Sequence, residues 1–117
     1  MKKTLLSLVS LAMALLLVAG CSSSKKSEKQ VHIGILQYVE HESLTAARKG
    51  FENELKDQGY IDGKNIKIDY QNAQGDQSNL QTISTSLLSK NDLVLGIATP
   101  AAQSLVNLST DTPILFT

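Results

Sequence analysis

The feature that most constrains this chain is a regular alternation of strand-like apolar runs and helical apolar stripes from residue 31 onward. Apolar residues recur at helical spacings of three and four in the stretches between the runs. The strand-like runs occupy residues 31–36, 65–70, 93–97 and 113–117. Alternating strands and helices predict right-handed βαβ crossovers and a parallel sheet. We therefore expect an α/β protein with a doubly wound sheet.

The ends of the three expected helices carry recognisable signals. Ser43 is a candidate N-cap for the first helix, and Gly59 is a candidate terminator. Asp76 precedes the second apolar stripe as a candidate N-cap. Thr99 is predicted to cap the third helix, with Pro100 in its first turn.

The composition of the runs predicts their order in the sheet. Residues 65–70 alternate polar and apolar side chains, as a strand near a sheet edge does. Residues 31–36 and 93–97 are largely apolar, which is typical of strands covered on both faces. These patterns favour the strand order 2-1-3-4, with the topological switch point between the first and third strands.

The first thirty residues indicate export. Residues 5–18 are mostly apolar and follow two lysines, but they fall short of the roughly 20 residues that a membrane-spanning helix needs. Residues 18–21 (VAGC) look like a lipobox, so residues 1–20 are predicted to be a lipoprotein signal peptide. Cys21, the only cysteine, would then carry the lipid, whereas an ordinary signal peptide ending near a cysteine is the alternative. Residues 21–30 are predicted to be a lipid-anchored flexible tether on the extracytoplasmic face of the cell membrane.

Charge and motif content exclude several classes of function. Removal of the signal peptide with Lys2 and Lys3 leaves nine basic and eleven acidic side chains, a balance that gives no support for a nucleic-acid partner. His32 and His41 have no cysteine near them with metal-ligand spacing. Glycine-rich phosphate loops and nucleophile elbows are missing from the sequence. We therefore expect neither a metal, a cofactor nor a catalytic site.

Open α/β sheets bind ligands just past the carboxyl ends of their strands, which directs attention to the segments there. Gln37 and Tyr38 follow the first strand, and the Tyr38 ring could lie against a flat ligand or could simply cover the start of a helix. The polar segment 72–76 follows the second strand, although a turn would need such residues in any case.

The segment after the third strand is the strongest candidate for binding an anionic group. Thr99, Pro100 and Ala101 open the third helix, where exposed amides and a hydroxyl suit a carboxylate. Thr99 could equally serve only as a helix cap, and the two roles are compatible.

Taken together, five separated segments resemble the ABC transporter substrate-binding family, whose members include tryptophan- and tyrosine-binding lipoproteins. The segments are residues 33–41, 63–65, 70–76, 97–103 and 113–117. This resemblance implies a two-lobed, type I periplasmic-binding fold that closes on a small molecule, with aromatic amino acids as the implied substrate class. It also implies an ABC permease as partner and no reaction chemistry.

The resemblance also implies roles for particular residues. In similar proteins the first lobe holds the ligand carboxylate through loops after strands three and four, which here correspond to Thr99, Ala101 and the region at and just beyond Thr117. Residues 31–117 are then expected to be a partial N-terminal lobe, truncated within its fourth strand. An extracytoplasmic ligand-sensing module and a flavodoxin-like enzyme are the alternatives.

Overall fold

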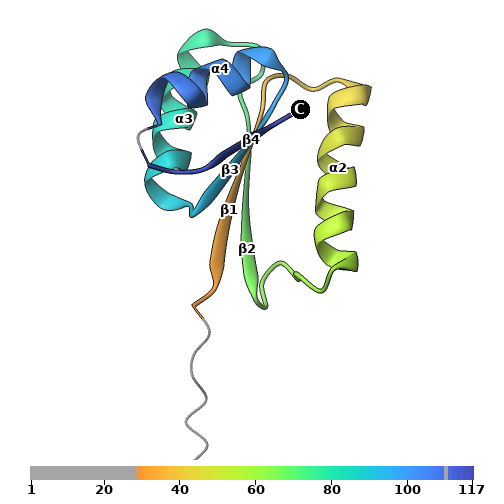
Figure 1. The fold of residues 1–117 in the computed structure, drawn as a ribbon. Helices are drawn as coiled ribbons and strands as arrows, with labels where there is room; N and C mark the ends of the chain where they lie inside the picture. The colour runs from red at the N-terminus through yellow and green to blue at the C-terminus, as the bar shows by residue number, and fades with distance from the viewer. Residues whose placement is uncertain (1–28, 110) are drawn as a thin grey trace, which may run out of the picture.

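Four parallel strands form the sheet of this protein, in the order β2-β1-β3-β4 (Figure 1). The computed structural model describes residues 29–109 and 111–117; the predicted signal peptide, Cys21 and most of the predicted tether lie outside these residues. The strands are β1 (Val31–Gln37), β2 (Ile66–Asn72), β3 (Leu93–Ile97) and β4 (Ile114–Phe116). The predicted strand order is confirmed, and so is the edge position of the second strand.

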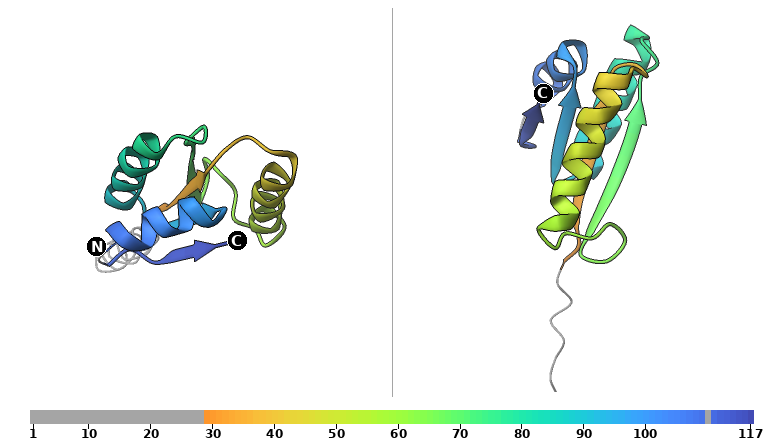
Figure 2. Two further views of the ribbon diagram at one scale, coloured as in Figure 1. Left: turned by 90° about the horizontal axis from the view of Figure 1, so that it is seen from above. Right: turned by 90° about the vertical axis from the view of Figure 1, so that its right-hand side faces the viewer.

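Three helices connect the strands and cover both faces of the sheet (Figure 2). They are α2 (Glu42–Asp57), α3 (Gln77–Lys90) and α4 (Thr99–Leu108). Helix α2 lies on one face, and α3 and α4 lie together on the other (Figures 1 and 2). Each helix follows one strand and precedes the next parallel strand, which gives the doubly wound arrangement predicted from the sequence.

Strand periodicity divides the core into two layers. Along β1, Ile35 faces α2, whereas Leu36 faces α3 and α4. Both side chains are completely buried, as expected for a strand with a neighbour on each side and helices on both faces. The first layer consists of Ile35, Leu95 and Ile97, packed by Leu44, Ala47, Phe51, Ile68 and Tyr70. The second consists of Leu36, Ala73, Leu80, Leu87, Val94, Ala101 and Leu105.

Two helix caps differ from the sequence prediction. Helix α2 is capped by His41, whose Nδ1 accepts a hydrogen bond from the amide of Ser43, so the prediction of Ser43 as N-cap is wrong. Helix α4 already includes Thr99, and Ala98 occupies its N-cap position, so the prediction that Thr99 caps this helix is also wrong. Both helices therefore start earlier than predicted, α2 at Glu42 and α4 at Thr99.

The other helix signals are confirmed. Asp76 caps α3 by accepting a hydrogen bond from the amide of Asn79 at 2.8 Å. Gly59 follows the C-cap of α2 with a φ of 90°, a conformation that glycine adopts without steric penalty. Pro100 lies in the first turn of α4, where its missing N–H leaves no helical hydrogen bond unmade.

The close packing of α4 on β3 depends on Gly96. A Cβ atom at this position would stand 3.0 Å from both the Cα and the backbone nitrogen of Ala102, and neither atom can move without shifting the helix. Gly96 therefore allows the start of α4, with the loop that precedes it, to lie directly on the sheet.

Substitution of Gly96 by alanine is expected to lower the free energy of unfolding by about 1–3 kcal/mol, because the added methyl group overpacks the interface between α4 and β3. Gly50→Ala is the matched control, since a Cβ there meets nothing within 4 Å on the surface of α2. The control should raise the free energy of unfolding by about 0.5–1 kcal/mol. Urea denaturation measures both, and equal effects would contradict the close-packing argument.

Candidate ligand site

Backbone hydrogen bonds bring the carboxyl ends of β1, β3 and β4 together at one end of the sheet, the upper end in Figure 1. We call this end, where the strands finish, the carboxyl edge. The amide of Tyr38 donates to the carbonyl of Ile97 at 3.2 Å, and the amide of Ala98 donates to the carbonyl of Thr117 at 3.0 Å. Three segments that are far apart in the sequence therefore meet where open α/β sheets bind ligands.

Ala98 gives the site its most unusual backbone conformation. Its φ of 76° and ψ of 152° lie in a region that is essentially restricted to glycine. This conformation turns the chain sharply from β3 into α4, while the carbonyl of Ala98 accepts a hydrogen bond from Ala102. Strained residues of this kind are held by the surrounding structure and are found most often at functional sites.

The N-terminus of α4 consequently points its first amides at this edge. Among the described residues, no side chain caps this terminus. The first N–H groups of a helix have no intrahelical acceptor, so the amide of the exposed Thr99 remains available to a ligand. The helix dipole adds a partial positive charge at the same place.

The predicted site residues of α4 differ in what they can offer. The Thr99 side chain is exposed, and Pro100 is half-buried. Ala101 is completely buried within the core layer beneath α3 and α4, backbone included, so the structure does not expose it to a ligand as the sequence prediction required. Thr117 is exposed, and its backbone is paired with both Gly96 and Ala98.

A hollow of about 350 Å³ extends from this edge along the outer side of α4. Thr99 and Thr117 lie at one end, and Val106 and Phe116 provide apolar surface along it. Phe116 is 72% exposed, which is unusual for an aromatic side chain in a strand. The full lining consists of Thr99, Ala102, Gln103, Val106, Asn107, Phe116 and Thr117.

Tyr38 is half-buried at the same edge, on the α3 and α4 side of the sheet. Its ring packs against the core layer there, and its hydroxyl donates to the carbonyl of Gly75 at 3.2 Å. The amide of Gly75 in turn donates to the carbonyl of Tyr38 at 2.8 Å. These bonds join the loop after β1 to the turn after β2.

Gln37 does not lie in the loop, where the sequence prediction placed it. It is the last residue of β1 and is completely buried. Its Nε2 donates to the carbonyl of Val39 at 2.9 Å and to Oγ1 of Thr45 at 3.2 Å. A side chain with these partners has no surface with which to contact a ligand directly.

Glu40 was not among the ligand-binding residues predicted from the sequence, but it lies at this edge. Glu40 accepts hydrogen bonds from Oγ1 of Thr45 at 2.6 Å and from Nδ2 of Asn72 at 3.3 Å. Glu40 is exposed, but both of its carboxylate oxygens are held in place by these bonds. No local pattern signals this arrangement, because Asn72 lies on a different strand.

Arg48 supports the α2 side of the edge. Its guanidinium carbon lies 4.4 Å from the centroid of the Tyr70 ring, and its Nη1 donates to both carboxylate oxygens of Glu52, at 2.9 and 3.1 Å. Burial acts to lower the pKa of Arg48, but the hydrogen bond and charge of Glu52 outweigh it and raise that pKa above its usual value. Arg48 therefore stays charged and holds the Tyr70 ring.

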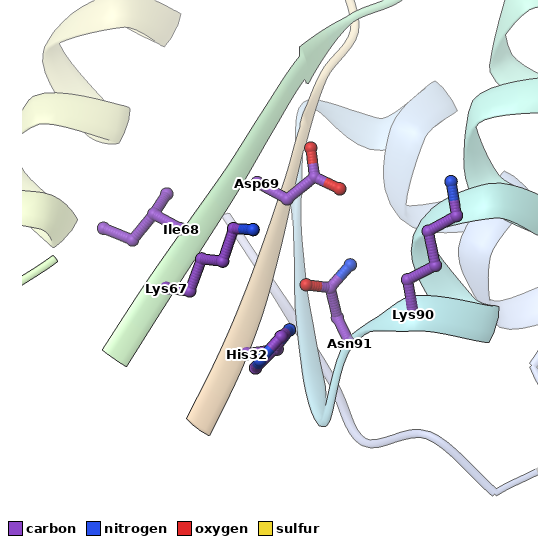
Figure 3. A pocket seen from close by; sticks show the side chains of 6 residues that line it. All are labelled: His32, Lys67, Ile68, Asp69, Lys90 and Asn91. Atoms are coloured by element: carbon purple, nitrogen blue, oxygen red, sulfur yellow. The ribbon is translucent and has the colours of Figure 1, made fainter. Parts of the chain in front are cut away.

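The opposite edge of the sheet carries a separate hollow of about 550 Å³ (Figure 3). It lies near the amino ends of β1 and β2 and the end of α3, and its side chains include His32, Lys67 and Asp69. Ligands of open parallel sheets bind at the carboxyl edge, so this hollow is not the candidate site. Throughout the part of the chain that the structure describes, no group of three or more histidine, cysteine or acidic side chains could hold a metal ion.

Comparison with known proteins now decides the family. A family model described as ABC transporter substrate binding protein matches residues 32–117. The chain belongs to this family. It is also 44% identical over 128 residues to a tyrosine-binding protein of Clostridioides difficile (strain R20291), covering 99% of this chain and 37% of that protein.

Solved structures of substrate-binding proteins share the fold. A ligand-free, open structure of a substrate binding protein with adhesive properties from Clostridium difficile matches with a TM-score of 0.71 and 47% identity. A Streptococcus pneumonia ABC domain in complex with L-Trp matches with a TM-score of 0.71 and 45% identity. In both comparisons the match covers 74% of this chain and 30% of the other. The α/β fold class and the family resemblance predicted from the sequence are therefore confirmed.

The strain at Ala98 can be tested by removing its Cβ atom. Ala98→Gly is expected to raise the free energy of unfolding by about 1 kcal/mol, because glycine adopts the observed conformation without a steric penalty. Ala46→Gly, at an exposed position of α2, should lower it by about 1 kcal/mol. Urea denaturation compares the two variants, and a loss of stability in both would show that Ala98 is unstrained.

Proposed function

We propose that this chain belongs to the solute-binding component of an ABC importer and that it binds an aromatic amino acid at the carboxyl edge of its sheet. The observation that carries the proposal is the uncapped N-terminus of α4, which Ala98 aims at the edge between Tyr38 and Thr117. A carboxylate is the ligand group that such a terminus binds best.

The chemistry of the edge suits an amino acid. The amide and the hydroxyl of Thr99 can donate hydrogen bonds to the ligand carboxylate. Val106 and Phe116 line the hollow that begins at Thr99, and the Tyr38 ring lies at the same edge; one of these surfaces would receive the aromatic side chain. Gln37 is completely buried, so it would not contact the ligand directly in this scheme.

The relatives support the choice of substrate class. One is a tyrosine-binding protein, and one solved structure contains L-Trp. Both are at least 44% identical to this chain in the matched region. Both relatives point to an aromatic amino acid, so we propose the same substrate class for this protein.

The mechanism that we propose is capture followed by delivery. The ligand would bind between this α/β unit and a second lobe, closure of the two lobes would remove it from water, and an ABC permease subunit would receive it. We propose no chemical reaction for this protein. Anchoring through a lipid on Cys21 would keep the protein at the extracytoplasmic face of the membrane, close to the permease. In the described residues, none of the helices has the length and apolarity required to cross a membrane.

Removal of the Thr99 hydroxyl tests the carboxylate site. Thr99→Val in the protein as encoded by its gene is expected to weaken binding of L-tyrosine and L-tryptophan about tenfold or more, because a hydrogen bond to a charged group is lost. Thr85→Val is the control, since Thr85 lies on the exposed side of α3 and bonds only to the carbonyl of Gln81. Isothermal titration calorimetry measures both. Unchanged affinity in the Thr99 variant, or no affinity of the unaltered protein for any aromatic amino acid, would reject this assignment.

The lipid anchor is tested separately at Cys21. Cys21→Ser is expected to move the protein from the membrane fraction to the soluble fraction, because each methylene of an acyl chain contributes about 0.8 kcal/mol to membrane binding. Ser22→Ala keeps the thiol and should leave the distribution unchanged. Intact-mass spectrometry of the N-terminal peptide detects the acyl groups directly. A soluble unaltered protein with an unmodified Cys21 would contradict lipidation.

A further inference from the structure

We infer that Gln37 is a positioning residue, which fixes the loop after β1 through a closed ring of side-chain hydrogen bonds and so presents Tyr38 to the ligand. This inference rests on the proposed function, and it assigns Gln37 a role different from the ligand contact expected from the sequence. The five members of the ring come from β1, β2, α2 and the loop after β1. They are Gln37, Thr45, Glu40, Asn72 and Tyr70.

The direction of each bond in the ring follows from chemistry. The carbonyl of Val39 can only accept, so the side of the Gln37 amide that faces it must be the NH₂ group. The remaining oxygen of the Gln37 side chain then accepts from the Tyr70 hydroxyl at 3.4 Å. The other hydrogen of the NH₂ group goes to Thr45, at 3.2 Å.

The rest of the ring closes on Glu40. Thr45 has accepted from Gln37, so its own proton goes to one oxygen of the Glu40 carboxylate at 2.6 Å. Asn72 donates to the other oxygen at 3.3 Å and also to the Tyr70 hydroxyl at 3.4 Å. The hydrogen bonds therefore form two paths from the donor Asn72 to the acceptor Glu40. One is the direct bond, and the other passes through Tyr70, Gln37 and Thr45.

Such a ring is sensitive to its buried member. Gln37 is completely buried, and its carboxamide uses both donors and its oxygen. Buried polar side chains that are fully satisfied fix the conformation around them, and bonds arranged head to tail polarise and strengthen one another. The 3.2 to 3.4 Å links are individually weak, so their closure into a ring, together with the short bond between Thr45 and Glu40, provides the rigidity.

The loop that the ring fixes is the one that carries Tyr38. Val39 is held through its carbonyl by Gln37, and Glu40 is held through its carboxylate by Thr45 and Asn72. Tyr38 itself has its backbone paired to Ile97 on one side and to Gly75 on the other. A loop that is ordered before the ligand arrives loses less conformational entropy on binding, so affinity increases without a direct contact from Gln37.

An amide is the only side chain of this size that satisfies the arrangement. A glutamate at position 37 would set a carboxylate oxygen against the carbonyl of Val39, and a methionine would leave the carbonyl of Val39 and the Tyr70 hydroxyl without their partner. The cation–π contact between Arg48 and Tyr70 does not replace the lost hydrogen bond, because it holds the aromatic ring of Tyr70 and not its hydroxyl group.

The test uses Gln37→Met, with Gln71→Met as the matched control, in the protein as encoded by its gene. Gln71 lies on β2 beside Tyr70, is exposed and bonds only to Asp69. Hydrogen exchange followed by mass spectrometry reads the loop without any ligand. Gln37→Met should speed exchange of the segment 38–41 about tenfold or more while the β3 amides stay protected, and Gln71→Met should leave both unchanged.

A double-mutant cycle with Tyr38→Ala then separates positioning from general destabilisation. We expect Gln37→Met to weaken L-tyrosine binding about tenfold in the presence of Tyr38 and to have almost no effect once Tyr38 is alanine. Fully additive losses in affinity, or unchanged exchange of the segment 38–41 in Gln37→Met, would overturn the inference. If the unaltered protein binds no aromatic amino acid, the proposed function fails. In that case faster exchange in Gln37→Met would still support the role of Gln37 in fixing the loop after β1, and unchanged exchange would reject that role as well.

Discussion

The parallel pairing of β1 with both β2 and β3 is the constraint on which the rest of the structure depends. Because these strands all run in one direction, each connection must cross the sheet through a helix, and every strand ends at the same edge. β1 is the central member, so its carboxyl end is surrounded by the loops that follow its neighbours. The candidate site is thus a result of chain direction before any particular side chain contributes to it.

The site itself is built mainly from backbone. Main-chain hydrogen bonds join the segments of Tyr38, Ala98 and Thr117, and the donor proposed for a ligand carboxylate includes the helix amide of Thr99. Side chains would support these backbone segments without contacting the ligand, as we infer for the hydrogen-bonded ring that contains Gln37. In the proposed site, this division would allow small residues such as alanine to dominate the binding segment, since a Cβ is all that a ligand would have to pass.

Sequence patterns predicted the sheet order and fold class because those depend on periodicity and composition. Residues 65–70 alternate, and the edge strand is found there; Asp76 precedes an apolar stripe, and it caps α3. The caps at Ser43 and Thr99 were mispredicted because in each helix the cap lies one or two residues before the hydroxyl-bearing side chain. In α2 the imidazole of His41 serves as the acceptor. In α4 the cap is Ala98, which pairs with Thr117 and has a positive φ. An alanine in the sequence gives no indication of this backbone conformation. Gln37 looked like a loop residue, since its partners Thr45 and Tyr70 are 8 and 33 positions away and only the folded chain brings them together.

The direction of β1 also determines where the candidate site lies relative to the N-terminal segment of the chain. The chain enters β1 at the edge opposite the candidate site, directly after the segment that joins it to Cys21 (Figure 1). Seven residues of strand separate the two edges by roughly 23 Å, and ten residues of tether add at most about 35 Å. With Cys21 in the bilayer, the candidate site would therefore lie at the end of the lobe that is farther from the lipid along the chain. The length and flexibility of the predicted tether would then determine how far the lobe can turn to bring a ligand to a permease.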